Sequence, residues 1–277
     1  MAIVTISRQI GSYGDEIAEK IAEELQYILI DKNKLHDMAK DLKGDYSKEI
    51  EVLSTESKPG FFDIFFNQRS GYTQLMSAMI YDFASRDNIV VRGRGGQFLL
   101  RDAPYVINVR IKAPLDLRVE RVTKSQNLDR EIVVSMVKKS DQSCEEFNKY
   151  LYDENVADNL WYDVIFDTAK ISQQTIVDFI VGEVKKIEAS TPMKEENKRK
   201  YNQLALEKRI EIVLLKEMND SNYIKVKAEF DGHVVISGYL STDAENAIAE
   251  KLIKNVRGVK SVNNKIVVSQ YPVKLWH

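Results

Sequence analysis

The chain has 277 residues, of which 44% are hydrophobic and 30% charged, so it can bury a core and is not globally disordered. Its 40 Lys and Arg against 42 Asp and Glu give a net charge of −2, so its composition gives no reason to expect a nucleic-acid partner. No apolar run is long enough for a membrane-spanning helix, and the first residues lack the pattern of a secretory signal. We expect a cytoplasmic protein with one large domain or two unequal ones.

Cysteine and histidine are too sparse for the usual metal sites. Cys144 is the single cysteine, which excludes an internal disulfide and a cysteine-based zinc cage. The three histidines lie far apart without metal-ligand spacing, so no metal-binding residue is predicted. With no histidine near it in sequence, Cys144 is expected to be a partly buried small side chain rather than a nucleophile.

Short apolar runs alternate with helical patterns over the first part of the chain, which we expect to form one domain at 1–188. Continuous apolar strands separated by helices predict an α/β fold, with a parallel sheet covered by helices on both faces. The predicted strands are Ile3–Ile6, Tyr27–Ile30, Asn88–Val91, Tyr105–Ile111 and Asp163–Asp167. Helices are predicted at about 14–26, 32–42, 71–86, 115–123, 129–150 and 172–187.

Two segments of this part have more than one interpretation. The aromatic cluster Phe61–Phe66 suits core or dimer packing better than a mobile substrate flap, which leaves a homodimer open. The stretch Ser190–Lys200 is strongly charged, contains a proline and has no apolar stripe. We interpret it as an inter-domain linker, expected at 189–201, or as the frayed start of a helix.

The remaining residues, 202–277, predict a small α+β domain with the order helix, strand, strand, helix, strand. Asp231 and Gly232 predict a tight hairpin between strands Tyr223–Phe230 and His233–Tyr239. Asp243 is expected to cap the second helix, and Val259–Val268 is expected to be the last strand.

The first turn from strand to helix contains candidate phosphate-binding residues. Backbone amides before a helix N-terminus favour anions. Gly11 and Gly14 would allow close approach of a phosphate, Ser12 could donate its hydroxyl, and Arg8 adds a guanidinium. The Walker A pattern does not fit this loop, because its first glycine falls on Arg8 and its lysine on Gly14. The loop alone leaves both phosphate binding and a plain glycine turn open.

Other candidate residues also have structural interpretations. Arg92 and Arg94 stand beside three glycines just after a strand, where ligands of parallel sheets bind, but they could also be solvated loop residues. Asp31 could cap the following helix. Arg118 and Arg121, one helical turn apart among acidic residues, could form a surface salt-bridge face.

Several motifs, in the same order along residues 1–185, resemble the cytidylate-kinase-like family of P-loop proteins. The motifs that carry this resemblance are Ser7–Gly14, Ile30-Asp31-Lys32, Val91–Gly96, and Ala113-Pro114 followed by Arg118 and Arg121. The resemblance implies a P-loop NTPase-like fold and phosphoryl transfer from ATP with Mg²⁺ to a nucleoside monophosphate.

The resemblance also implies roles for individual residues. The loop of Arg8, Gly11, Ser12 and Gly14 would hold the donor phosphates, and Glu16 could touch a hydrated metal. Asp31 would place the acceptor nucleoside, Arg94 with Arg92 would bind the acceptor phosphate, and Arg118 and Arg121 would lie toward the lid and the donor base. Arg8, Arg94 and Asp141 are the candidate catalytic residues.

This sequence departs from the family pattern at three places. Gly95 replaces the aspartate that follows the arginine in the family turn, and the lysine of the phosphate loop is absent. The expected lid, Lys138–Lys149, keeps Asp141 but has lysines where the related kinases carry arginines. Lysine is a point charge rather than a bidentate fork, so these changes favour weak catalysis.

The C-terminal part resembles the BON domain. The resemblance rests on Asp231-Gly232, Val234–Gly238 and above all Val256–Asn264, which ends in the pattern G-V-x-x-V-x-N. It implies a module that binds lipid, a small ligand or a partner domain, although its ligand is not specified.

Three hypotheses follow. The first is a nucleotide-binding protein that transfers phosphate to a nucleoside monophosphate such as CMP. The second is a catalytically silent nucleotide-binding regulator that has lost the P-loop lysine and the lid arginines. The third is a scaffold in which only the BON-like module binds a ligand.

Overall fold

The computed structural model describes residues 2–41, 69–86, 88–101, 103–190, 195–218 and 221–269. Its contacts divide the chain into two compact units. Unit 1 comprises Met1–Asn67 and Arg86–Lys194, and unit 2 comprises Gln68–Ser85 and Glu195–His277. The predicted aromatic cluster Phe61–Phe66 lies outside the described residues. None of the helices in the described parts of the chain is long and apolar enough to cross a membrane.

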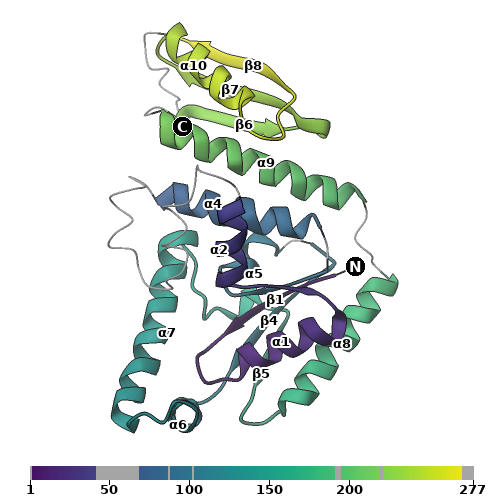
Figure 1. The fold of residues 1–277 in the computed structure, drawn as a ribbon, viewed down its shortest axis with the longest axis vertical. Coiled ribbons are helices and arrows are strands. Elements are labelled where there is room, and N and C mark those ends of the chain that lie inside the picture. The colour runs from purple at the N-terminus through teal and green to yellow at the C-terminus, as the bar shows by residue number, and fades with distance from the viewer. Residues whose placement is uncertain are drawn as a thin grey trace. The chain divides into compact units, whose positions relative to one another are not determined.

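Unit 1 is a five-stranded sheet in the order β2-β3-β1-β4-β5, in which all neighbouring strands are parallel (Figure 1). The predicted parallel α/β fold is therefore confirmed. The strands are β1 (Ile3–Arg8), β2 (Ile28–Ile30), β3 (Ile89–Arg92), β4 (Val106–Lys112) and β5 (Val164–Asp167). The helices are α1 (Gly14–Leu25), α2 (Lys32–Asp41), α5 (Gly96–Leu99), α6 (Leu115–Gln126), α7 (Arg130–Tyr152) and α8 (Gln173–Ser190).

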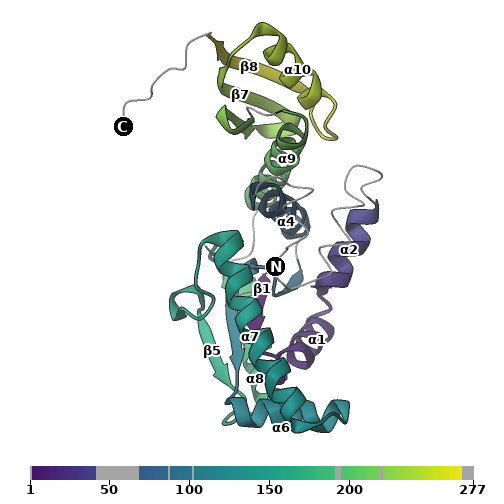
Figure 2. The ribbon, with the colours of Figure 1, turned by 90° about the vertical axis from the view of Figure 1, so that its left-hand side faces the viewer.

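The central strand β1 is buried because helices cover the sheet. Apolar side chains of α1 and α8 pack against one face of β1 and β4, with Ile17, Ile21 and Ile176 fully buried. Figure 2 shows α1 beside the sheet of unit 1. On the opposite face, the Thr5 hydroxyl donates to Asn108 Oδ1 at 2.7 Å. A parallel order with β1 in the centre brings the carboxyl ends of β1, β3 and β4 to one edge, where ligands of such sheets bind.

Unit 2 has the predicted order of helix, strand, strand, helix and strand. Strand β6 (Ile224–Ala228) pairs antiparallel with β7 (His233–Leu240), and β8 (Ser261–Val268) pairs parallel with β7. Helix α9 (Glu195–Glu217) and α10 (Asp243–Lys254) supply the apolar side chains that cover the sheet. Helix α9 begins at Glu195, so the charged stretch before residue 201 is in large part a helix start.

Helix α4 (Arg69–Ala84) groups with unit 2, although it precedes β3 in sequence. The ring of Tyr81 stacks on Tyr201 of α9 with the centroids 6.0 Å apart. Arg209 Nη1 of α9 lies 3.6 Å from Asp82 Oδ1 of α4. Pairing with α9 is a tertiary contact that the pattern of residues 71–86 did not indicate.

The cap of α10 differs from the prediction. Thr242, rather than Asp243, is the N-cap, because its side chain accepts the Glu245 amide hydrogen while the Glu245 carboxylate accepts the amide hydrogen of Thr242. This reciprocal capping box satisfies two amides at the helix start, and Asp243 becomes the first helical residue.

Glu207 on α9 makes the stability of unit 2 dependent on pH. Burial raises the pKa of Glu207, and the nearby Glu211 carboxylate raises it further. The hydrogen bond from the Ala228 amide to Oε1, at 2.9 Å, lowers this pKa but does not cancel the increase. The protonated carboxyl therefore stabilises the folded state: this contribution is complete below the pKa of Glu207 in the unfolded chain and is lost as the pH rises through its folded-state pKa. The Glu207→Gln variant keeps an acceptor for Ala228 and should be more stable than wild type at pH 8. Urea unfolding at pH 8 and at pH 4 should show this gain at pH 8 and little of it at pH 4, and an equal gain at both values would contradict the explanation.

Candidate functional site

The β1–α1 loop, residues 9–13, is held by hydrogen bonds to its backbone carbonyl groups. These bonds come from a hydroxyl within the loop, from two arginines of α6 and from the residue that follows β5. Because the carbonyl groups are all directed to protein donors, the loop has one fixed conformation. Ser12 Oγ donates to the Gln9 carbonyl at 2.6 Å, and Thr168 Oγ1 donates to the Ser12 carbonyl at 3.0 Å. Arg118 Nη1 donates to the Ile10 carbonyl at 3.3 Å, and Arg121 Nη1 donates to the Gly11 carbonyl at 3.2 Å.

Some backbone amides of this loop can donate hydrogen bonds to an anion, because they are not used by protein acceptors in the described part of the chain. Among the residues that the structure describes, the amides of Gly11 and Tyr13 have no hydrogen-bond acceptor. Both residues have a left-handed backbone, with φ of 75° and 63°, and Tyr13 immediately precedes α1. Ser12 is fully buried and its hydroxyl bonds within the loop, so it shapes the turn. Free amides before a helix N-terminus form a site that favours a phosphate.

Gly14 is required because the side chain of Arg8 packs on it. A Cβ atom at residue 14 would lie 2.3 Å from Arg8 Cβ and 2.8 Å from Arg8 Cγ. The guanidinium of Arg8 extends to the turn after β3, since a Cβ on Gly93 would lie 2.9 Å from Arg8 Nη1. Arg8 therefore lies over the position where the Walker A lysine would stand.

Acidic side chains of α1, together with Asp31 just after β2, surround the cations of this edge. Arg8 Nε lies 2.8 Å from Asp15 Oδ1. Arg92 Nη2 lies 2.7 Å from Asp31 Oδ2, and its other nitrogens contact Glu19 at 2.9 Å and Asp15 at 3.5 Å. Asp31 also accepts the amide hydrogen of Lys34 in the first turn of α2, so it both caps this helix and holds Arg92.

Arg94 lies in a strained turn after β3. Gly93, Arg94 and Gly95 all have a left-handed backbone, with φ of 73°, 58° and 71°, which is uncommon for arginine. Arg94 is only 5% exposed, and its carbonyl accepts the hydroxyl hydrogen of Tyr152 at 2.8 Å. A Cβ at Gly95 would lie 2.2 Å from the Tyr152 ring, so the aspartate of the family pattern has no room here. Strain of this kind in a buried cation is typical of functional sites.

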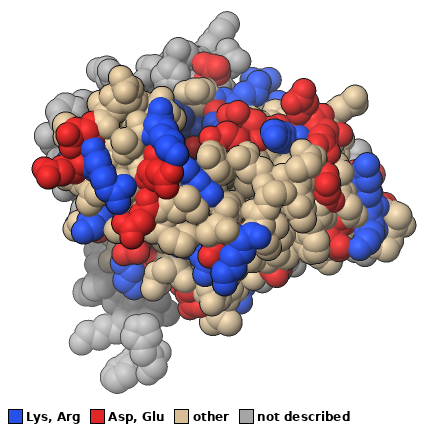
Figure 3. All heavy atoms as spheres, turned by 90° about the horizontal axis from the view of Figure 1, so that it is seen from below, with Lys and Arg blue, Asp and Glu red and all other residues tan. Residues whose placement is uncertain are grey.

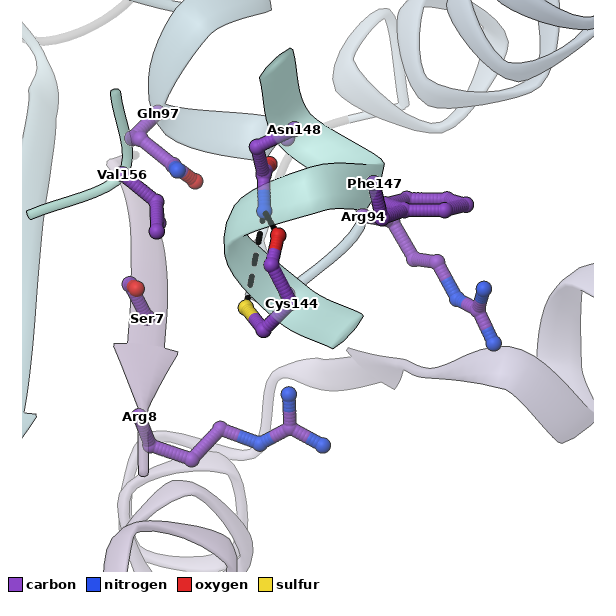
Figure 4. A pocket seen from close by; sticks show the side chains of 10 residues that line it. Ser7, Arg8, Arg94, Gln97, Cys144, Phe147, Asn148 and Val156 are labelled. Carbon is purple, nitrogen blue, oxygen red and sulfur yellow. Dashed lines mark hydrogen bonds between the residues drawn. The ribbon is translucent and has the colours of Figure 1, made fainter. Parts of the chain in front are cut away.

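Two adjoining cavities lie at the carboxyl end of β1. The first is about 30 Å³ and is lined by Arg8, Arg94 and residues of α7 (Figure 4). The second is about 140 Å³ and extends from Arg8 along the loop to Asp15 and Asp141. The two cavities share Ser7, Arg8, Cys144 and Val156. The structure thus brings Arg8 and Arg94 to one pocket, although Arg8 ends β1 and Arg94 follows β3, far apart in sequence.

Arg118 and Arg121 support the loop from behind. Arg118 is 3% exposed and forms a bidentate pair with Asp141 of α7, at 2.7 Å and 3.1 Å. It also donates to the Ala113 carbonyl at 3.1 Å. Arg121 bonds to Thr168 at 2.8 Å, and its guanidinium lies 4.1 Å from the centre of the Tyr13 ring. Both arginines are thus bonded to protein groups, and Asp141 joins α7 to the loop through Arg118.

The pocket contains polar residues that were not predicted as site residues. Ser7, Gln97 and Asn148 line the first cavity, and Arg110 lines the second. Tyr162, whose pKa is raised by burial, donates its hydroxyl hydrogen to Ser7 Oγ at 3.1 Å. Asn148 and Arg110 stand within a predicted helix and a predicted strand, whereas Ser7 and Gln97 lie outside the predicted elements. An outward position on β1 and β4 was the only signal that could have revealed Ser7 and Arg110.

Among the described residues, the face of the molecule seen in Figure 3 carries no broad basic patch. Figure 3 shows basic and acidic side chains interspersed over one face of the molecule. Within the described ranges, no cluster of three or more His, Cys, Asp and Glu residues could hold a metal ion. Asp15 and Glu16 are exposed in the first turn of α1, so they are the carboxylates beside the loop that could contribute ligands to a cation.

Comparisons with known proteins agree with this geometry. A model of the Cytidylate kinase-like family matches residues 3–170, and the BON domain model matches residues 203–270. A cytidylate kinase of Methanocaldococcus jannaschii is 23% identical over 180 residues, which are 64% of this chain and 94% of that protein. A cytidylate kinase of Methanosarcina mazei is 24% identical over 64% of this chain and 93% of its own length.

A solved structure has the same fold. An uncharacterized protein from Eubacterium ventriosum superposes with a TM-score of 0.52 at 24% identity, covering 67% of this chain and 99% of its own. At this level of identity the likeness concerns the arrangement of strands and helices in unit 1.

Proposed function

Since the chain belongs to the Cytidylate kinase-like family, we propose that unit 1 binds a nucleotide by its phosphates and transfers a phosphoryl group from ATP to a nucleoside monophosphate such as CMP. Phosphoryl transfer requires mainly that the reactants are positioned and that cations neutralise the charge that develops. The relevant chemistry is therefore carried by guanidinium groups and backbone amides at the edge of the sheet.

The observation that carries this proposal is the convergence of Arg8 and Arg94 on one pocket beside free loop amides. Arg8 lines both cavities, and Arg94 is buried in the wall of the first (Figure 4). We assign the donor phosphates to Arg8 and to the amides of Gly11 and Tyr13, and the acceptor phosphate to Arg94. Mg²⁺ would arrive with ATP and supply charge neutralisation between its phosphates.

The other candidate residues act as positioning residues in this proposal. Arg118 and Arg121 hold the loop through its carbonyl oxygens, and Asp141 holds Arg118. Asp31 orients Arg92, whose guanidinium is shared among carboxylates. Ser12 closes the turn, and Gly14 makes room for Arg8.

A catalytically silent nucleotide-binding protein is the second candidate, and a specific contact favours it. Asp15 pairs with Arg8 at 2.8 Å, so a phosphate must compete with this carboxylate for the cation that replaces the missing lysine. The carboxylates of Asp15, Glu19 and Asp31 likewise engage Arg92.

The test is calorimetric titration of the full chain with ATP, CMP and CDP, with and without Mg²⁺, followed by a coupled assay of CMP-dependent ADP release. We expect Arg94→Ala to lower kcat/KM by about 100-fold or more, because it removes a buried charge that contacts the phosphate. Arg130→Ala is the matched control, since Arg130 is 56% exposed and pairs only weakly with Asp116 at 3.3 Å.

Each outcome separates the two candidates. ADP release that depends on CMP and is lost in Arg94→Ala supports the kinase. Nucleotide binding without turnover supports the silent protein. Equal activity of the Arg94→Ala and Arg130→Ala variants would refute the assignment of Arg94.

A further inference from the structure

Unit 2 contains a pocket that is larger than either of the two cavities beside Arg8. It has a volume of about 440 Å³, within the size of small-ligand sites, and lies between α9 and the turn that joins β6 to β7. All its lining residues belong to unit 2. We call it the α9 pocket.

One wall of the α9 pocket is a single stripe of α9. Arg199, Asn202, Gln203, Leu206 and Arg209 recur at helical spacing and all line it. Leu206 is 5% exposed and gives this wall an apolar floor. Arg209 is held beside Asp82 of α4 at 3.6 Å, and Arg199 stands at the other end of the stripe. The helix therefore presents two guanidinium groups, two amides and an apolar patch.

The opposite wall carries an exposed aromatic ring and two carboxylates. Phe230 is 59% exposed, although large apolar side chains are normally buried, and the Arg199 guanidinium lies 5.8 Å from the centre of its ring. Glu229 and Asp231 flank Phe230 in the same turn. An aromatic face between a guanidinium and carboxylates is suited to a flat ligand that has both hydrogen-bond donors and an anionic group.

The turn is fixed before any ligand binds. Asp231 and Gly232 both have a left-handed backbone, with φ of 57° and 82°. The Gly232 carbonyl accepts the Lys260 amide hydrogen at 2.8 Å, and a Cβ on Gly232 would lie 2.1 Å from the Gly258 oxygen. The Glu229 amide also donates to the His233 carbonyl at 2.7 Å. These contacts hold Phe230 outside the core of unit 2.

We propose that the α9 pocket is a second ligand site, which binds a nucleoside or a nucleoside monophosphate. The base stacks on Phe230, the amides of Asn202 and Gln203 hydrogen-bond to its edge, and the carboxylates of Glu229 and Asp231 accept from the ribose hydroxyls. A single phosphate pairs with Arg199. Stacking of a base on an aromatic side chain contributes to affinity without requiring a particular base.

The charges of the pocket favour a monophosphate over a triphosphate. Its two arginines are balanced by Glu229 and Asp231, and Asp82 already contacts Arg209. No excess of positive charge is left for a polyphosphate, whereas the pocket of unit 1 places Arg8 and Arg94 together. The two sites should therefore differ in the nucleotides that they prefer.

Binding to the full chain tests this proposal. Titrations with adenosine, AMP and ATP would be done in the Arg94→Ala background, which weakens the site of unit 1. Phe230→Ala should weaken binding of both adenosine and AMP by about fivefold or more, because the stacking surface is lost. Arg199→Ala should weaken AMP but leave adenosine unchanged, since only AMP carries a phosphate.

The matched control is Tyr223→Ala, which removes an aromatic side chain of the same unit that is 62% exposed and does not line the pocket. It should leave both affinities unchanged. Phe230 is exposed, so Phe230→Ala should fold, and its urea midpoint would be measured alongside. A complete absence of adenosine and AMP binding, unchanged affinity in Phe230→Ala, or tighter binding of ATP than of AMP at this site would overturn the proposal.

Discussion

Replacing Gly14 by lysine, which supplies the residue of the Walker A pattern, is expected to damage the site rather than restore it. The new Cβ would lie 2.3 Å from Arg8 Cβ and 2.8 Å from Arg8 Cγ. β1 and α1 would have to separate, or Arg8 would have to leave the loop. We expect a loss of about 1 to 3 kcal/mol in the free energy of unfolding of unit 1, as for other overpacked sites. Affinity for ATP should fall with it.

The paired variant Arg8→Gly with Gly14→Lys should reverse most of this damage. Removing the Arg8 side chain opens the space that the lysine stem needs, leaving Ile111 Cβ at 3.3 Å as the next neighbour. The positive charge for binding phosphate would then come from the lysine introduced at residue 14, at the start of α1. We expect the stability to return to within about 1 kcal/mol of wild type, the remainder being the cost of glycine in a strand. ATP affinity should exceed that of Arg8→Gly alone.

The stability of unit 1 is measured by urea unfolding, followed by Trp161 fluorescence in a Trp276→Phe background. Trp161 reports on unit 1 because its ring packs on Phe98 with the ring centroids 4.9 Å apart. The affinity for ATP is measured by calorimetric titration. The four chains form a double-mutant cycle in which the two positions should be strongly coupled. If the effects of Arg8→Gly and Gly14→Lys simply add, then Arg8 does not occupy the place of the lysine.

Removing Arg118 is expected to cause the largest loss of stability in unit 1. Its side chain is 4% exposed and holds Asp141 in a bidentate pair, while also donating to the carbonyls of Ile10 and Ala113. Arg118→Ala leaves Asp141 and both carbonyls without this donor. Breaking a fully buried ion pair from one side costs about 3 to 5 kcal/mol, and because the Asp141 side chain is 28% exposed we expect a loss near the lower end of this range. Because the loop carbonyl of Ile10 is released, ATP affinity should fall as well.

A second variant keeps this test informative if Arg118→Ala does not fold. Asp141→Asn keeps the size of the side chain and one acceptor oxygen for Arg118 but removes the charge, so it should cost less stability. If Asp141 acts only through Arg118, the loss of ATP affinity in Asp141→Asn should follow the loss of stability. A fully folded Asp141→Asn protein with normal ATP affinity and no turnover would instead assign Asp141 a direct catalytic role.

The control for the ion pair is Lys124→Ala. Lys124 and Glu120 form a pair at 2.6 Å on the same helix as Arg118, but their side chains are 74% and 52% exposed. An exposed pair of this kind contributes less than about 1 kcal/mol. If Lys124→Ala and Arg118→Ala lower the free energy of unfolding equally, burial of Arg118 does not strengthen its pair with Asp141.

The strands and helices of unit 1 could be predicted closely because local patterns control them. The apolar run before Arg8 is β1, and the run from Tyr105 to Ile111 lies within one residue of β4. The Asp231-Gly232 turn likewise joins β6 to β7, as its left-handed backbone requires. Caps were predicted less well, since Thr242 and Asp243 are both suitable N-caps and only the Glu245 partner selects Thr242.

The sequence motifs indicated residues that the structure places around one pocket, but they did not indicate which partners these residues contact. Arg8 and Arg94 were identified because they closely follow predicted strands next to glycines, and both line the pocket. Arg118 and Asp141 were identified by their place in motifs, yet the structure pairs them with each other. A motif gives the position of a side chain along a helix, whereas its partner depends on which elements pack against that helix.

By itself, the amino-acid sequence determined the alternation of strands and helices, the glycine loop before α1 and the order of elements in unit 2, because hydrophobic periodicity and turn residues act over a few positions. Only the tertiary structure decided that Arg8 fills the space above Gly14, that α4 pairs with α9, and that Arg118 and Arg121 donate to the loop carbonyls. These contacts join residues that are distant in sequence, and packing alone determines which of the available partners a side chain meets.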